Sequence, residues 1–248
     1  FVTMDSTTGN PVAGENTISA IQMMIDILSG RREPYEVPRR NENIPTKKII
    51  IDKQFALYFL AHFIGDIHQP LHVGNDKDFG ANNCLVKWYG EVRKDEGFWN
   101  LHAVWDEALI ERLKVGRQDL TNDVMARLSM LSINQILKLK DPLAWAEESS
   151  KIRPSVYPQL KLKNPISELE QPYCNNPKYK NLPGMFGPNP IDIFDVEAMK
   201  AAEKQVLEDK EIPRLQYDYS YAQIELAKRQ LLKAGVRLAY VLDQIYNK

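Results

Sequence analysis

The chain has 248 residues, with 32 Lys and Arg against 33 Asp and Glu, which leaves a formal net charge of −1. Its hydrophobic content of 44% is too high for a disordered protein, and the balanced charge argues against a polybasic binder. Two cysteines, Cys84 and Cys174, exclude a disulfide-scaffold protein and a cysteine-rich zinc finger.

Helical periodicity dominates the first part of the chain. Apolar residues recur at spacings of three and four over 16–28, which predicts an amphipathic helix. The charges and prolines of 31–45 indicate an exposed connection. A long apolar helix is expected over 47–67, ending near Pro70 because proline has no backbone donor. No apolar run approaches the roughly 18 residues of a membrane span.

One short strand is predicted at 84–88, paired with 90–93 in a small hairpin. Beyond the hairpin the patterns are helical again, with Thr121–Asp123 and Asp141 as candidate helix caps. The helices are expected over 100–114, 120–139, 142–151, 194–209 and 219–246.

The segment 154–190 contains eight of the 15 prolines and is predicted to be an irregular surface excursion within one domain. The whole chain, 1–248, is therefore predicted to form a single, mainly α domain. The sequence leaves open whether Cys84 and Cys174 form a bridge or remain buried thiols.

The histidines carry the chemical signal, because His62, His68, His72 and His102 all lie within one stretch of 41 residues. His62 and Asp66 are four residues apart on a predicted helix, so their side chains project from the same face. His102 and Asp106 repeat this spacing on a later helix.

His72 follows Pro70, where the chain can turn back toward Asp66. Three imidazoles and two carboxylates are therefore expected to converge between two helices, a common place for metals in helical proteins. Zinc suits this donor set, and non-haem iron is the main rival. The alternative is that each His–Asp pair is only a hydrogen-bonded pair within its helix. His68 points to a different helix face, which favours a structural role.

These residues resemble a known family signature. The blocks are His62–His72 (HFIGDIHQPLH), Asp78–Asn82 (DFGAN) and Asn100–Asp106 (NLHAVWD). In this order they are similar to the zinc-dependent, single-strand-specific nuclease and 3′-nucleotidase family, the S1/P1 type, which shares its fold with bacterial zinc phospholipase C. The resemblance implies a multi-helix fold and a cluster of three zinc ions.

Mapped onto this chain, the resemblance implies that His62 binds one zinc of a close pair and that Asp66, the candidate catalytic residue, bridges that pair. His72, His102 and Asp106 match the ligands of the third zinc.

Asp78 and Asn82 match a motif beside the cleft, with expected second-layer or substrate contacts. Ala81 stands where the family usually has Gly, a departure that narrows the loop.

A larger departure lies at the start of the chain. Three zinc ions need about nine protein ligands, and the five candidates do not suffice. The family takes its remaining ligands from an N-terminal segment that this sequence does not contain, so the chain is expected to be a fragment. Phe1 would match the aromatic residue that stacks on the substrate base.

The expected activity is hydrolysis of phosphodiesters in single-stranded DNA and RNA by metal-activated water, giving 5′-phosphate products, with 3′-nucleotidase activity. Two rivals remain open: a zinc phospholipase C on the same scaffold, and an inactive, zinc-stabilised fragment that holds one ion. The resemblance also implies export, into the periplasm or out of the cell. No membrane partner is expected, and no protein partner is implied.

Overall fold

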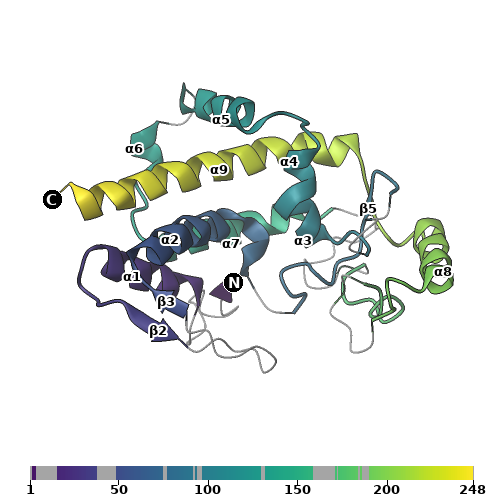
Figure 1. The fold of residues 1–248 in the computed structure, drawn as a ribbon. Coiled ribbons are helices and arrows are strands. Elements are labelled where there is room, and N and C mark those ends of the chain that lie inside the picture. Colours follow the sequence, from purple (N-terminus) through teal and green to yellow (C-terminus); the bar gives the residue numbers. More distant parts are fainter. Residues whose placement is uncertain are drawn as a thin grey trace.

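The computed structural model describes residues 16–37, 49–74, 77–91, 93, 97–129, 132–158, 171, 173–183, 185 and 190–247, together with the backbone of residues 2–3. The molecule is mainly α, as predicted, and four of its helices, labelled in Figure 1, build the main core. They are α1 (Thr17–Leu28), α2 (Lys53–His68), α7 (Pro142–Ile152) and α9 (Tyr217–Tyr246). Helix α2 contacts the other three, with α1 on one side and α9 on the other.

Polar caps set where these helices begin. The Asn16 side chain accepts hydrogen bonds from the first turn of α1, and Asp52 accepts from the Phe55 amide at the start of α2. Asp141 caps α7 as predicted. Helix α2 ends at His68, because Gln69 is extended before Pro70.

The apolar faces of these helices form the main core. Ile21, Leu60, Ile64 and Trp145 are fully buried within it. Burial of each such side chain stabilises the fold by about 1.5–3 kcal/mol. In this core α2 packs against both α7 and α9.

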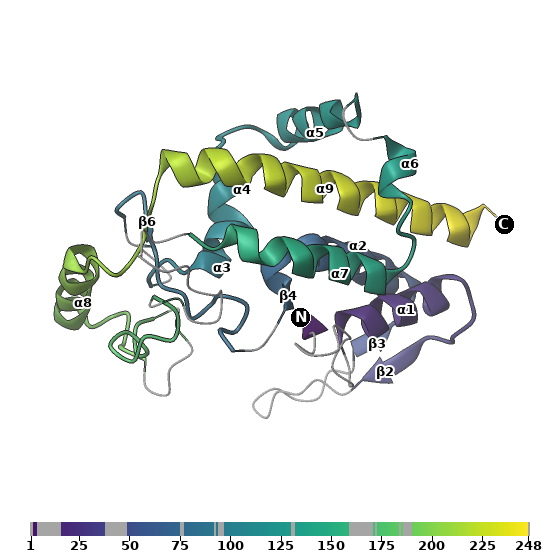
Figure 2. The same cartoon turned by 180° about the vertical axis from the view of Figure 1, so that it is seen from behind.

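The other helical segments lie outside this group of four, and all but α8 are shorter than its members. They are η1 (Pro70–His72), α3 (Leu101–Ala103), the π-helical turn η2 (Val104–Ala108), α4 (Leu109–Glu111), α5 (Arg117–Ala126), η3 (Arg127–Ser129), α6 (Ile133–Ile136), η4 (Arg153–Val156) and α8 (Val196–Glu208). Figure 2, from behind, shows α8 at the end of the molecule away from α1.

The strands among the described residues form three two-stranded pairs, in addition to isolated bridges. Strand β2 (Tyr35–Val37) pairs antiparallel with β3 (Ile49–Ile51). The other two pairs are parallel: β1 (Val2–Thr3) with β4 (Val73–Gly74), and β5 (Lys87–Trp88) with β6 (Arg214–Leu215).

Three local predictions were wrong. The helix expected to begin at 47 begins at Lys53, because the β-branched run Ile49–Ile51 forms a strand instead. Its partner, Tyr35–Val37, lies in the predicted connection. The predicted hairpin is reduced to a bridge between Trp88 and Glu91, because β5 takes its main partner from β6, far along the chain.

The helix expected over 120–139 was also wrong, because it divides into α5, η3 and α6. Its predicted caps at Thr121–Asp123 fall inside α5, whose N-cap is Gly116. The predictions for 142–151, 194–209 and 219–246 were confirmed to within two residues as α7, α8 and α9.

The described residues of segment 154–190 include several that are buried in the interior of the protein. Tyr173, Tyr179 and Leu182 are buried in core clusters, and Cys174 forms a disulfide with Cys84. The bridge settles the question that the sequence left open and ties this irregular segment to the residues preceding β5. Among the described residues, no helix is both long enough and apolar enough to cross a membrane.

Candidate metal centre

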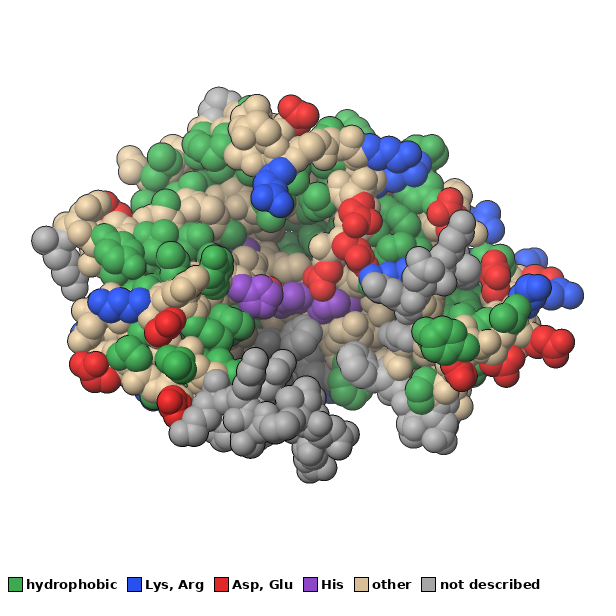
Figure 3. Space-filling model, in the orientation of Figure 1, with side chains coloured by type: hydrophobic (Ala, Val, Ile, Leu, Met, Phe, Trp, Pro, Cys, Tyr) green, Lys and Arg blue, Asp and Glu red, His purple; other side chains and the backbone are tan. Residues whose placement is uncertain are grey.

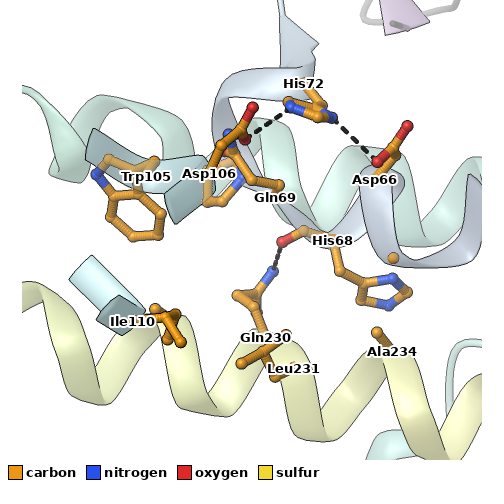
Figure 4. Close-up of a pocket in the computed structure, with 13 residues that line it drawn as sticks. Asp66, His68, Gln69, His72, Trp105, Asp106, Ile110, Gln230, Leu231 and Ala234 are labelled. Carbon is orange, nitrogen blue, oxygen red and sulfur yellow. Dashed lines mark hydrogen bonds and ion pairs between the residues drawn. The ribbon is translucent and has the colours of Figure 1, made fainter. Parts of the chain in front are cut away.

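Five predicted site residues form one row of alternating imidazoles and carboxylates. At one end, His62 Nε2 lies 3.3 Å from Asp66 Oδ2, and Asp66 Oδ1 lies 3.5 Å from His72 Nδ1. At the other end, His72 Nε2 lies 3.0 Å from Asp106 Oδ1, and His102 Nε2 lies 3.0 Å from Asp106 Oδ2. Figure 4 shows His72 between the two carboxylates. The predicted convergence of these side chains is therefore present.

The end of α2 and the turn after it supply the first half of the row. His62 and Asp66 occupy successive turns of α2, as their spacing predicted. The chain then turns through η1, where the Gln69 side chain accepts from the Leu71 amide and donates to Asp106 Oδ1 at 2.9 Å. Gln69 thus joins the turn to the second half of the row. Its role was not predicted, because the contact depends on a residue 37 positions away.

The second half of the row lies on the helical run formed by α3, η2 and α4. This helical run begins at Leu101, directly after the N-cap Asn100, and Asp106 lies inside the π-helical turn η2. Single π turns within helices are frequent at functional sites. His102 and Asp106 nevertheless remain in contact, and the rings of His72 and His102 stack with centroids 4.8 Å apart.

A backbone carbonyl fixes the tautomer of His102. Its Nδ1 lies 2.7 Å from the carbonyl oxygen of Gly80, and a carbonyl only accepts, so Nδ1 carries the proton. In the neutral ring that a metal requires, the lone pair is therefore on Nε2, the nitrogen nearer Asp106. This is the second-layer arrangement that metal-binding histidines usually have. The carbonyl is presented by a turn in which Phe79, Gly80 and Ala81 all have positive φ, at 54°, 64° and 65°.

Asp78 and Asn82, the other predicted contacts, hold this turn and do not reach the row. Asp78 is buried, with 3% of its surface exposed. It accepts hydrogen bonds from the Ala81 amide at 3.1 Å, from Arg153 Nη2 at 2.7 Å and from the Tyr157 hydroxyl. The Asn82 side chain donates to the Phe79 carbonyl at 2.9 Å. Arg153 was missed because it lies 75 residues from Asp78.

The row is strongly coupled electrostatically. Burial alone would lower the pKa of His72, but hydrogen bonds to Asp106 and Asp66 outweigh burial and raise it to about 9. Burial would raise the pKa of Asp106, but hydrogen bonds from His102 and His72 hold it far below its usual value. Without metal, the protein therefore holds a proton on His72 at neutral pH, between two carboxylates.

The donor set at the His102 end fits a divalent ion. One ligand atom from each of His72, His102 and Asp106 lies within 4.8 Å of the others. A tetrahedral ion with ligands at about 2.0–2.1 Å separates them by ~3.3 Å, close to the observed contacts of 3.0 Å between each imidazole and Asp106. Two imidazoles and a carboxylate suit zinc, and also iron.

His68 lies outside the row, in the structural position expected for it. Its Nδ1 lies 2.6 Å from the Ile64 carbonyl, and Arg237 Nη1 lies 2.7 Å from its Nε2. Burial lowers its pKa to about 4. His68 is therefore neutral near pH 7 and contacts the core.

Part of the row borders a pocket of about 210 Å³ between α2, η2 and α9. Asp66, His72 and Asp106 lie on one side of it, and Gln230 and Leu231 of α9 lie on the other. In Figure 3 the histidines gather near the middle of the visible face. Trp105, to which the sequence assigned no functional role, also lines the pocket.

Phe1, the predicted base-stacking residue, lies outside the described residues. The backbone after it is described: Val2 pairs with Val73, and Thr3 with Gly74. Residues 2–3 therefore run beside the strand that directly follows His72.

Comparison with known proteins identifies related sequences. The sequence profile of the S1/P1 nucleases matches residues 3–180. Endonuclease 2 of Arabidopsis thaliana is 30% identical over 193 residues, which cover 77% of this chain and 52% of that protein. Endonuclease 4 of the same plant is 29% identical over 192 residues, covering 77% and 50%. Nuclease S1 of Aspergillus oryzae is 43% identical over 100 residues, covering 40% and 27%. The chain spans about half the length of these plant relatives.

Proposed function

The chain belongs to the S1/P1 nuclease family, and we propose that it takes part in zinc-dependent hydrolysis of phosphodiester bonds in single-stranded DNA and RNA. The proposed products carry 5′-phosphates, and 3′-nucleotides are proposed as further substrates. The observation that carries the proposal is the row of three imidazoles and two carboxylates from His62 to His102.

We assign distinct tasks to the residues of the row. His72, His102 and Asp106 would hold one zinc ion, with Gly80 and Gln69 orienting His102 and Asp106. His62 and Asp66 are proposed ligands of a neighbouring ion pair, with Asp66 as the bridge. Bound zinc supplies Lewis-acid chemistry, because it polarises phosphate oxygens and lowers the pKa of water. The full family complement of three ions remains a prediction.

The relatives favour a nuclease over a phospholipase C. Two are named endonucleases and one is named Nuclease S1. Single strands are the proposed substrates because an unpaired base can reach an aromatic surface that a paired base cannot.

The disulfide between Cys84 and Cys174 supports an exported protein. Such bonds form and persist in oxidising compartments and are rare where thiols are kept reduced. We therefore propose that the protein is secreted or periplasmic.

Metal content and cleavage measured together test the proposed function. The purified chain, with its intact mass confirmed, is assayed on a single-stranded oligonucleotide, its duplex and a 3′-mononucleotide, with and without a chelator. We expect hydrolysis of the single strand and the mononucleotide that the chelator removes and zinc restores. Equal activity with and without metal would contradict zinc dependence. Bound zinc without any hydrolysis would favour the inactive, zinc-stabilised alternative.

Zinc binding is expected to release the His72 proton. The pKa of His72 in the metal-free protein is about 9, above its ordinary 6.5, and only neutral imidazole binds metal. Zinc affinity should therefore rise about tenfold per pH unit as pH increases from about 6.5 to 9. Conversely, the hydrogen bonds of protonated His72 stabilise the metal-free fold below pH 6.5, and this stabilisation is lost as pH rises through 9.

Calorimetry in buffers with different ionisation enthalpies checks this prediction. At pH 7 the His72 site should release one proton for each zinc bound, and at pH 10 this release should disappear. His72→Gln provides the control, because it removes that proton without adding charge. Equal proton release by the variant and the parent at pH 7 would refute the assignment.

A further inference from the structure

Exposed tyrosines gather at the start of α9, and none of them is a proposed metal ligand. Tyr217 and Tyr221 are exposed, at 71% and 83% of their surface, one turn apart at the start of α9. Residues four apart project from the same helix face, with a rise of about 6 Å between them. Two large, exposed rings in succession are unusual, because aromatic side chains are normally buried.

An arginine completes this surface. The Arg112 guanidinium carbon lies 3.9 Å from the ring centre of Tyr89 and 5.7 Å from that of Tyr217. The rings of Tyr89 and Tyr217 are perpendicular, with centres 5.1 Å apart. Arg112 is exposed, so its charge faces solvent. We call Tyr89, Arg112, Tyr217 and Tyr221 the tyrosine platform.

Hydrogen bonds fix Tyr89, the half-buried side of the platform, and the first turns of α9 that carry the two exposed rings. The Tyr89 hydroxyl lies 2.6 Å from Ser220 Oγ, and its amide donates to the Leu215 carbonyl at 2.8 Å. Trp105 Nε1 donates to the Tyr219 hydroxyl at 2.8 Å, which joins the helix of the metal centre to α9. A preformed surface loses little conformational entropy when it binds a ligand.

The helices that carry most of the platform also line the pocket beside the metal centre. Arg112 directly follows α4, on the helical run that carries Asp106. Six residues separate the two, which is about 9 Å along a helix. Figure 1 shows α4 beside the beginning of α9, where Tyr217 begins the helix. The rings lie further away along α9, because Tyr217 precedes Ala227, the first residue of α9 that lines the pocket, by ten residues, or about 15 Å. A strand a few nucleotides long can span this separation.

We propose that the tyrosine platform binds single-stranded nucleic acid beside the metal centre, with a base stacked on Tyr217 or Tyr221 and a phosphate paired with Arg112. This inference rests on the proposed function for the identity of its ligand. Stacking on aromatic rings combined with arginine is how proteins bind single strands without reading their sequence. The platform therefore recognises unpaired bases of any type and holds the strand during cleavage.

Binding without cleavage gives the decisive test. The affinity of the full chain for a fluorescein-labelled, single-stranded 12-mer is measured by fluorescence anisotropy, with excess chelator so that no strand is cut. Chelation also removes any contribution of zinc to the affinity, so the platform is expected to make the main contribution to the measured affinity. Tyr217→Ala is expected to weaken binding about 5- to 20-fold, and Tyr217→Phe to bind as the parent does.

The chain provides a matched control at the other end of the same helix. Tyr246 is 59% exposed and ends α9, so Tyr246→Ala removes another exposed ring and should leave binding unchanged. Arg112→Met should lower the slope of log affinity against log salt by about one. An abasic 12-mer should bind weakly to the parent and be insensitive to Tyr217→Ala.

Two results would overturn the platform: equal affinity of Tyr217→Ala and Tyr246→Ala, or parental affinity for the abasic strand. Either can occur while zinc-dependent cleavage is intact. Conversely, cleavage can prove independent of zinc while the anisotropy result stands, so the two proposals fail separately. Equal binding of the 12-mer and its duplex would also refute stacking, because paired bases offer no free face.

Discussion

Replacing Asp106 with Asn is expected to weaken zinc binding by at least about 100-fold and to remove hydrolysis of single strands. Asp106 is the residue that both imidazoles at the His102 end share, because its two oxygens lie 3.0 Å from His72 and His102. Loss of a second-layer partner alone typically lowers metal affinity 10–100-fold, so loss of a charged ligand should cost more. Competition with a chromophoric chelator measures the affinity.

The matched control for this variant is Glu107→Gln, in the same π-helical turn. Glu107 loses the same charge in the substitution, but its carboxylate pairs with Arg93. Its zinc affinity should remain near that of the parent. Parental affinity in Asp106→Asn would show that zinc is held elsewhere.

Replacing Arg153 with Met is expected to lower the free energy of unfolding by about 3–5 kcal/mol, because it leaves the buried Asp78 carboxylate without its cation. The two side chains are only 2% and 4% exposed. The same change should lower zinc affinity about 10–100-fold. Asp78 holds the turn whose Gly80 carbonyl orients His102, so the turn should loosen when Arg153 is lost.

A second buried arginine gives the control for Arg153. Arg127 is also poorly exposed, but its partners Asp123 and Glu225 are nearly half exposed. Water can therefore solvate them in Arg127→Met, which should destabilise the protein less and leave zinc affinity unchanged.

The coupling between Arg153 and Asp78 is measured on three variants, Arg153→Met, Asp78→Asn and the double variant. Denaturant unfolding gives their stability, and competition with a chelator gives their zinc affinity. The double variant should be more stable than Arg153→Met, because no buried charge is left unpaired. Equal zinc affinity in Arg153→Met and Arg127→Met would show that the turn does not depend on this ion pair.

The row of the metal centre was predictable because its information is local. His62 with Asp66, and His102 with Asp106, are each four residues apart on one helix, and a proline places His72. The second layer was not predictable in the same way. Arg153 meets Asp78 across 75 residues, and the contact of His102 is to a backbone carbonyl, which has no sequence signature.

The errors in the fold have the same origin. The run Ile49–Ile51 is apolar throughout, so its periodicity does not distinguish a strand from the start of α2. It forms a strand because it pairs with Tyr35–Val37, a segment that its own pattern does not reveal. Likewise β5 pairs with β6, more than 120 residues away, and local turn residues predicted only the nearby bridge from Trp88 to Glu91.

The bond between Cys84 and Cys174 closes a covalent ring across a sequence separation of 90 residues. His102 and Asp106 lie inside this ring, whereas Asp66 and His72 lie before it. In the chain-entropy account, closing a ring of this size contributes about 4–5 kcal/mol by restricting the unfolded chain. Oxidation during maturation would thus favour the fold in which the two halves of the centre meet. The redox potential of the compartment that receives the newly made protein becomes a determinant of how readily the centre forms.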